Sequence, residues 1–148
     1  MPTYAVNKRA HADYEVLNEF EAGIVLTGQE VKSVRDGNMS LLGAYVTLAA
    51  GAARLIGSHV PRYGKARADE SFDPDRSRLL LLHKAELNKI VGKMVQKGLT
   101  LVPLSVYTRG SKIKLKFALA RGKKQFEKRE QIKKRDLDRD IKRTFKIG

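Results

Sequence analysis

The sequence predicts a mainly β fold, a small Greek-key barrel with flanking helices and a basic carboxy-terminal tail. Five or six short segments have the apolar pattern of strands and are separated by turn residues. Two further segments have the apolar spacing of amphipathic helices. The last 28 residues carry 12 of the 30 Lys and Arg residues but few apolar ones. We therefore expect one domain over residues 1–120 and a separate tail over residues 121–148.

The first 12 residues are expected to form a short basic arm ahead of the first strand. Its exposed charged residues would be Lys8, Arg9 and His11. From Asp13 the apolar residues follow a β-like pattern through residue 26, although the alternation is imperfect. Gly23 interrupts this strand, and glycine inside a strand often marks a bend or a bulge.

A short helix and a hairpin are predicted next. Thr27 and Glu30 have the spacing of a capping box, so a helix should begin there and end at Asp36-Gly37-Asn38. Strands over residues 44–48 and 53–60 flank Ala50-Gly51, a pair typical of a hairpin turn. Residues 61–77 are polar and rich in charge, which indicates a long loop.

The second half of the chain predicts a helix between strands. Residues 79–82 form a short apolar run that could be a strand or the start of a helix. Residues 84–97 predict a helix that ends at Gly98. Its apolar face would hold Leu87, Ile90, Val91, Met94 and Val95. Residues 99–107 predict a strand, and Pro103 inside it favours an edge or bulge position.

Residues 112–119 alternate almost perfectly between apolar and charged residues. The inward face would hold Ile113, Leu115, Phe117 and Leu119, and the outward face Lys112, Lys114 and Lys116. Such a strand places a basic stripe on the surface of a sheet. Strands of this number and length favour a small barrel, and the OB-fold, an oligonucleotide-binding class, agrees with the charge. Strand count alone leaves an SH3-like barrel open.

The composition makes a polyanion the expected partner, because the net charge is +14 and the pI is near 10.1. A basic surface that serves only solubility is the alternative. Cysteine is absent, which excludes disulfides and thiolate metal sites. We find neither the apolar core of a secretory signal nor a stretch long enough to span a membrane, so we expect a cytoplasmic protein.

Little in the sequence indicates catalysis. His11, His59 and His83 lack the spacing of metal ligands, and the P-loop, dinucleotide-binding and zinc-protease motifs are absent. Asp73 and Asp75 could hold metal ions in a nuclease, but both stand in a polar segment where solvation is the simpler explanation. We therefore expect a protein without catalytic activity, cofactor or bound metal.

The tail, residues 121–148, combines high positive charge with few apolar residues. On a helical wheel Phe126, Leu137, Ile141 and Phe145 fall within one narrow sector. This stripe cannot fold the tail alone, because helix nucleation is costly without a packed core. We expect the tail to fold on an anionic partner. A docked carboxy-terminal helix and a solvated run of charge are the alternatives.

Six stretches of sequence span most of the chain in a fixed order. They are NKRA at residues 7–10, DYEVLNEFEAGIVLTGQEVKSVRDG at 13–37, YVTL at 45–48, DPDRSRLLLLHKAEL at 73–87, GLTLVPLSVY at 98–107 and KIKLKFALARGKKQFEKRE at 112–130. Together they resemble the SsrA-binding protein family. The resemblance implies an OB-type barrel and a tail that is disordered when free and helical when bound. It also implies a non-enzymatic adaptor that binds transfer-messenger RNA (tmRNA) and delivers it to stalled ribosomes in trans-translation. We expect a monomer.

The same resemblance implies two groups of functional residues. The barrel would bind the tRNA-like domain of tmRNA through Asn7, Lys8, Arg9, Glu21, Leu81, His83 and Lys114. The tail would enter the empty mRNA channel and fold against 16S ribosomal RNA near the decoding centre. Its ribosome-binding residues would be Gly122, Lys123, Lys124, Gln125, Phe126, Lys128 and Arg129. For Glu21, a salt bridge within the protein is a competing interpretation.

The chain departs from the family pattern at three places, one of which is Thr144-Phe145, where the family often has an apolar pair. His11-Ala12 stands where the family usually has Arg-His, and Glu127 stands where Asp is usual. These departures put an RNA contact by the histidine in question and lengthen one acidic side chain of the tail. Two other functions remain as alternatives, a ribosomal structural protein whose tail stays in ribosomal RNA and a metal-dependent nuclease.

Overall fold

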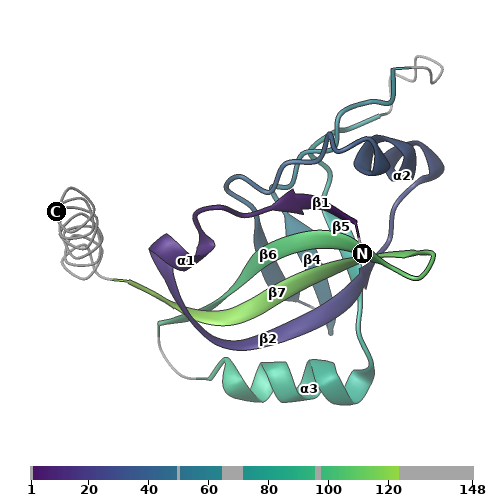
Figure 1. Ribbon diagram of the computed structural model, residues 1–148. Helices are drawn as coiled ribbons and strands as arrows, with labels where there is room; N and C mark the ends of the chain where they lie inside the picture. The colour runs from purple at the N-terminus through teal and green to yellow at the C-terminus, as the bar shows by residue number, and fades with distance from the viewer. Residues whose placement is uncertain (1, 50, 65–71, 96–97, 124–148) are drawn as a thin grey trace, which may run out of the picture.

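The computed structural model describes residues 2–49, 51–64, 72–95 and 98–123 (Figure 1). The strands within those ranges are β1 (Thr3–Val6), β2 (Tyr14–Ile24), β3 (Tyr45–Ala49), β4 (Ala52–Ile56), β5 (Arg78–Leu81), β6 (Leu99–Arg109) and β7 (Lys112–Gly122). The helices are α1 (Ala10–Asp13), α2 (Gly28–Arg35) and α3 (Lys84–Lys93). The expected mainly β architecture with few helices is confirmed, although the strands outnumber the five or six that were predicted.

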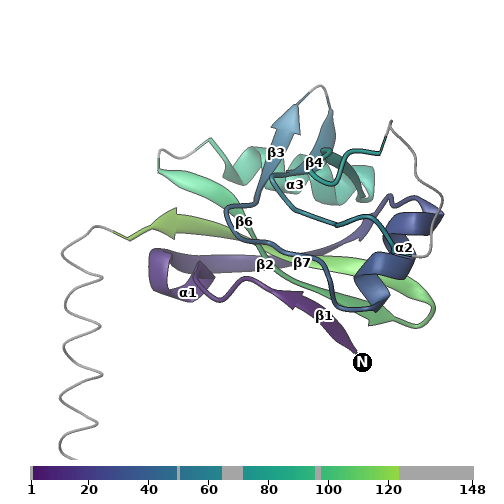
Figure 2. The ribbon, with the colours of Figure 1, turned by 90° about the horizontal axis from the view of Figure 1, so that it is seen from above.

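Six of the strands form a ring. The antiparallel sheet has the order β1-β6-β3-β4-β5-β2-β7, and β7 pairs back with β6. The strand pairing in the ring is shortest between β3 and β6, which share the single residue pair Val46–Leu101. Figure 1 shows α3 running beneath β2, while α1 and α2 lie at opposite ends of the long strands (Figures 1 and 2).

The core fills the inside of the ring, and β7 contributes one whole face to it. Its apolar residues Ile113, Leu115, Phe117 and Leu119 are buried, and the rings of Phe20 and Phe117 lie 5.6 Å apart. On the other face Lys112 is exposed and Lys114 and Lys116 are half-buried. The predicted apolar face and basic stripe of this strand are confirmed.

The amino-terminal residues correct one prediction, because they form a strand and a helix and not an arm. β1 pairs with β6, and α1 follows at once. The side-chain amide of Asn7 donates to the carbonyl oxygen of Pro103 at 2.9 Å, and its backbone N–H donates to Leu104 at 2.8 Å. Lys8 and Arg9 are exposed, as predicted. Alternation over a strand as short as β1 is too brief to be read from sequence.

Pro103 lies in a β-bulge, which is one of the two positions predicted for it. The register of β6 against β7 shifts between Pro103 and Ser105. The alternative of an edge strand is wrong, because β6 has β7 on one side and both β1 and β3 on the other. Proline lacks the N–H of a regular ladder, and the bulge is a place where that bond is not needed.

The two longer helices agree with the sequence at their starts. Thr27 and Glu30 form the predicted capping box of α2, and Gly37 follows the helix with φ +81°. α3 begins at Lys84 as expected but ends at Lys93, four residues before the predicted end. Only Ile90 of its face is fully buried, and Val91 and Val95 are 50% and 81% exposed. The helix therefore touches the barrel along a narrower strip than its apolar spacing suggested.

A buried ion-pair network connects α2 to the chain ahead of β5. Arg78 is fully buried and donates to Oε2 of Glu30 at 2.7 and 3.0 Å, and Arg76 donates to both oxygens of the same carboxylate. Burial alone would raise the pKa of Glu30. The hydrogen bonds from Arg76, from the backbone of Thr27 and from Arg78 outweigh burial and hold that pKa below 4.5.

The remaining sequence predictions are partly met. The hairpin turn at Gly51 joins β3 to β4, but β4 ends at Ile56, and His59 makes only an isolated bridge with Ser40. The apolar run from residue 79 is the strand β5. Of the predicted loop, residues 65–71 lie outside the described residues.

Candidate nucleic-acid interface

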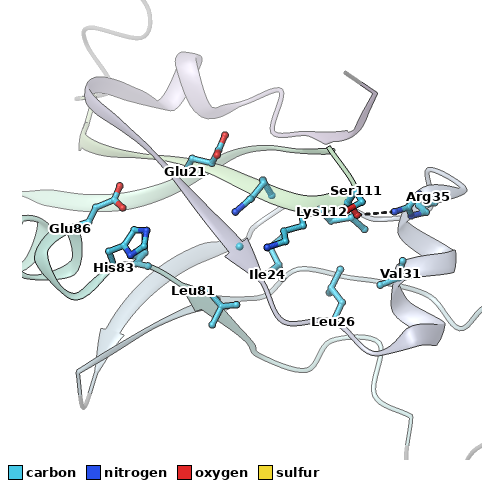
Figure 3. Close-up of a pocket in the computed structure, with 14 residues that line it drawn as sticks. Glu21, Ile24, Leu26, Val31, Arg35, Leu81, His83, Glu86, Ser111 and Lys112 are labelled. Carbon is cyan, nitrogen blue, oxygen red and sulfur yellow. Dashed lines mark hydrogen bonds between the residues drawn. The ribbon is translucent and has the colours of Figure 1, made fainter. Parts of the chain in front are cut away.

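A groove of about 750 Å³ opens between β2, β5, the starts of α3 and β7, and the end of α2 (Figure 3). Four of the predicted RNA-binding residues line it, namely Glu21, Leu81, His83 and Lys114. They come from β2, from β5 and the N-cap of α3 that follows it, and from β7, so the folded ring brings these three parts of the chain together. A concave site with a few convergent polar groups is the usual form of a ligand site.

Gly23 of β2 lies between two of these residues. It pairs with Leu81 of β5 on one side and with Lys114 of β7 on the other. A Cβ added at Gly23 would lie 3.4 Å from the Cβ of Leu81, an ordinary contact distance, so the space beside Leu81 does not require a glycine. The register shift of β2 falls between Val16 and Asn18, and the predicted bulge at Gly23 is therefore wrong.

The groove has a basic end and a mixed end. At the basic end Arg35 of α2 donates to the carbonyl oxygen of Ser111 at 3.3 Å, beside the exposed Lys112 (Figure 3). At the other end His83 precedes α3 and Glu86 lies in its first turn. Leu81 is 58% exposed, an apolar surface that a nucleobase or ribose could cover. This combination of cations and exposed apolar surface suits a nucleic acid.

Glu21 has partners within the protein. The hydroxyl of Tyr107 donates to its Oε2 atom, and Nε of Arg109 lies 3.5 Å from the same oxygen. Burial and the hydrogen bond to Glu21 raise the pKa of Tyr107 to about 12, so its hydroxyl remains a donor at neutral pH. The intramolecular salt bridge that competed with an RNA contact in the sequence interpretation is therefore present.

A second hollow of about 600 Å³ adjoins the groove. The two share Glu21 and Glu86, and the second also reaches Tyr107 and Arg109. The sequence analysis did not single out Arg35, Tyr107 or Arg109. Arg35 lies at the groove, and Tyr107 and Arg109 lie at the neighbouring hollow, because of how β6 pairs with β7 and how α2 packs, which a local pattern does not contain.

Three predicted RNA-binding residues lie apart from the groove. Asn7, Lys8 and Arg9 line a separate hollow of about 210 Å³, next to residues 39–42. The side-chain amide of Asn7 donates to the carbonyl oxygen of Pro103, as described above. Nε of the exposed Arg9 lies 3.5 Å from Oδ2 of the half-buried Asp13, one helical turn away. The residues predicted to bind RNA on the barrel therefore lie in two separate places, four in the groove and three in this hollow.

Two predicted tail residues fall within the described part of the chain. Gly122 is the last residue of β7, and the backbone N–H of Lys123 donates to the carbonyl oxygen of Asp13 at 2.9 Å. Nζ of Lys123 donates to the carbonyl oxygen of His11 at 2.7 Å. The point where the tail leaves the barrel is thereby fixed against α1. The residues Lys124, Gln125, Phe126, Lys128 and Arg129 lie outside the described residues.

The same ranges contain neither a metal-binding cluster nor a membrane-spanning helix. Within residues 2–49, 51–64, 72–95 and 98–123, no three His, Cys, Asp or Glu side chains are grouped so as to hold a metal ion. His59 and Asp75 lie 2.7 Å apart as an exposed pair. In that part of the chain no helix is long and apolar enough to cross a membrane.

The chain is similar to proteins of one family over nearly its whole length. Residues 4–147 match the family model described as SmpB protein. An SsrA-binding protein of Sulfurihydrogenibium sp. (strain YO3AOP1) is 48% identical over 142 residues, which cover 96% of this chain and 93% of that protein. An SsrA-binding protein of Coprothermobacter proteolyticus is 47% identical over 149 residues and 99% of each chain.

A solved structure is similar as well. One chain described under "tmRNA-SmpB: a journey to the center of the bacterial ribosome" matches with a TM-score of 0.67 and 45% sequence identity. The match covers 81% of this chain and 84% of that chain.

Proposed function

The chain belongs to the SmpB protein family, and from this we propose that its barrel and its tail bind different RNAs during one task. That task is the family's function: the chain is a non-enzymatic protein that binds tmRNA in trans-translation on the ribosome. The barrel would hold the tRNA-like domain of tmRNA, and the tail would hold the ribosome. The proposal places the protein in the cytoplasm, where ribosomes work.

We propose that the groove is the tmRNA site and that the barrel is of the OB type. The observation that carries this proposal is the convergence of Glu21, Leu81, His83 and Lys114 on one groove. A closed ring of antiparallel strands with a basic outer stripe supports the oligonucleotide-binding class. Lys8 and Arg9, in their separate hollow, would contact the RNA backbone outside the groove.

The decisive measurement is binding to tmRNA against an ordinary tRNA and an unrelated RNA at matched salt. We expect the full chain to prefer tmRNA and the preference to remain as salt weakens all three complexes. Equal affinity for the three RNAs would overturn the proposed function.

Replacing both Lys112 and Lys114 by Ala is expected to weaken tmRNA binding by about tenfold or more. Both lysines line the groove, so two phosphate contacts would be lost. The slope of log affinity against log salt should fall by about two, one for each contact. Arg54→Ala combined with Lys89→Ala is the matched control, because it removes two exposed positive charges, on β4 and α3, that do not line the groove. An equal loss in the control would assign the effect to overall charge.

The tail proposal concerns residues beyond Lys123. We propose that Lys124, Gln125, Lys128 and Arg129 contact 16S ribosomal RNA in the empty mRNA channel, with Gly122 and Lys123 at its entry. The tail would be unfolded in the free chain and helical in the channel, since its apolar stripe is too narrow to fold alone. A permanent ribosomal protein is the second candidate, and it would remain at one copy per ribosome after a high-salt wash.

We propose that Phe126 stacks on a base at the decoding centre, so Phe126→Ala is expected to slow the tagging of stalled peptides by about tenfold while leaving tmRNA affinity unchanged. A stacked base contributes about 1–3 kcal/mol, which the alanine would remove. Phe126→Tyr retains a ring and should tag at nearly the normal rate. Tagging at the full rate by the alanine variant would remove the stacking role.

A further inference from the structure

Glu21 stands at the junction of the groove and its neighbouring hollow, and both of its contacts use one oxygen. Tyr107 donates to Oε2, and Nε of Arg109 approaches the same atom at 3.5 Å. The carboxylate is partly covered, whereas the Arg109 side chain is 62% exposed. The structure records no other hydrogen bond or ion pair of Arg109 with the described residues.

Arg109 ends β6, at the hairpin that leads into β7. An exposed arginine there would move freely among many rotamers, and holding it in one costs entropy. The Glu21 carboxylate restrains Nε. Two NH₂ groups then remain with their donors unused, in the planar arrangement that binds a phosphate through two hydrogen bonds.

We infer that Glu21 serves RNA binding by positioning Arg109 for a phosphate of the bound RNA, with Tyr107 holding the carboxylate in place. The inference rests on the proposed tmRNA-binding function and gives Glu21 a role without a direct RNA contact. Arg109 is the group that touches the RNA, from the hollow that adjoins the groove at Glu21.

The chain contains a matched control for this inference. Glu19 precedes Glu21 by two residues on β2 and so lies on the same face of the strand. It pairs with Lys116 at 3.4 Å, and both side chains are about half exposed. Glu19→Gln and Glu21→Gln remove the same charge at neighbouring positions. Removal of a carboxylate near phosphates should by itself strengthen RNA binding, because it removes a repulsion.

The first experiment measures binding of the tRNA-like domain of tmRNA at several salt concentrations. We expect Glu21→Gln to bind about tenfold more weakly, with a salt slope smaller by about one. Glu19→Gln should bind as tightly as the unaltered chain or more tightly. Circular dichroism checks that both variants are folded. Equal gains in affinity for the two variants would overturn the inference.

Tyr107→Phe separates positioning from direct contact, since it removes only the hydroxyl. If Glu21 positions Arg109, affinity should fall by roughly threefold, because the carboxylate loses its support. A Glu21 that contacted RNA directly would gain a free oxygen, and affinity would stay the same or rise. That second result contradicts the inference even if Glu21→Gln folds poorly.

Combining Glu21→Gln with Arg109→Gln completes the test. The double variant should bind no more weakly than Arg109→Gln alone, because Glu21 acts only through the arginine. Losses that multiply would show a separate contact by Glu21 and would overturn the inference. The unaltered chain gives an independent reading, because a lack of preference for the tRNA-like domain would overturn the proposed function itself.

Discussion

A chain truncated after Gly122 is expected to bind tmRNA within about threefold of the full chain and to leave stalled peptides untagged. β7 ends at Gly122, so the truncation spares every strand of the ring. The truncation removes Lys123 and with it the hydrogen bonds to the carbonyl oxygens of Asp13 and His11. Binding of the RNA to the barrel should therefore persist.

Tagging should be lost because the truncated chain keeps its contact with tmRNA but loses the linked contact of its tail with the ribosome. A second linked contact raises overall affinity by about 10²–10⁴, so tagging in reconstituted stalled ribosomes should fall at least about a hundredfold. Replacing Lys123, Lys124, Lys128 and Arg129 by Ala should give a milder loss, because the rest of the tail remains. If tmRNA binding fell as far as tagging, the division of roles between barrel and tail would be wrong.

Arg78→Met is expected to lower the free energy of unfolding by about 3–5 kcal/mol. Arg78 is fully buried and donates to Glu30, to the hydroxyl and carbonyl of Ser58, and to the carbonyls of Pro74 and Arg76. Methionine fills much of the space but leaves these acceptors without a donor. Urea unfolding followed by circular dichroism would give the difference.

Arg76→Met is the matched control, because Arg76 binds the same carboxylate from a position 33% exposed. Water can replace part of its bond, so the expected loss is only about 1 kcal/mol. Equal losses for the two variants would show that burial does not decide the strength of these ion pairs.

The same network has a pH signature. The pKa of Glu30 is lowered in the folded state, so its stabilisation is fully present above the ordinary value of 4.5 and is lost as pH falls through the lowered pKa. In Glu30→Gln the stability should depend less on pH in this range. That comparison assigns part of the acid sensitivity to one carboxylate.

The sequence predicted the parts of the fold that local patterns encode. Strict alternation placed β7 and its lysine stripe correctly, and the spacing of Thr27 and Glu30 placed the start of α2. β1 is too short to alternate convincingly, and the end of α3 depends on how far its face contacts the barrel. Both are decided by tertiary packing, which overrides local preference.

The candidate site was predictable only in pieces. Family resemblance pointed to Glu21, Leu81, His83 and Lys114, and the ring brings these residues to one groove. Tyr107 and Arg109 carry no local signal, because their importance comes from facing Glu21 across strands 86 and more residues apart in the chain. The Glu30 network is hidden for the same reason. Arg76 and Arg78 form a buried ion-pair network only when the folded chain brings them against Glu30 of α2.

Among the described residues β7 is the last strand, and it completes the ring. β7 pairs with β2, where Tyr14 meets Gly122, and also with β6. While the chain is being synthesised, β2 has no partner on that side until β7 has emerged. Contacts between such distant segments form slowly, since closing a long loop costs entropy before any pairing repays it. The barrel should therefore form in one late step during its own synthesis.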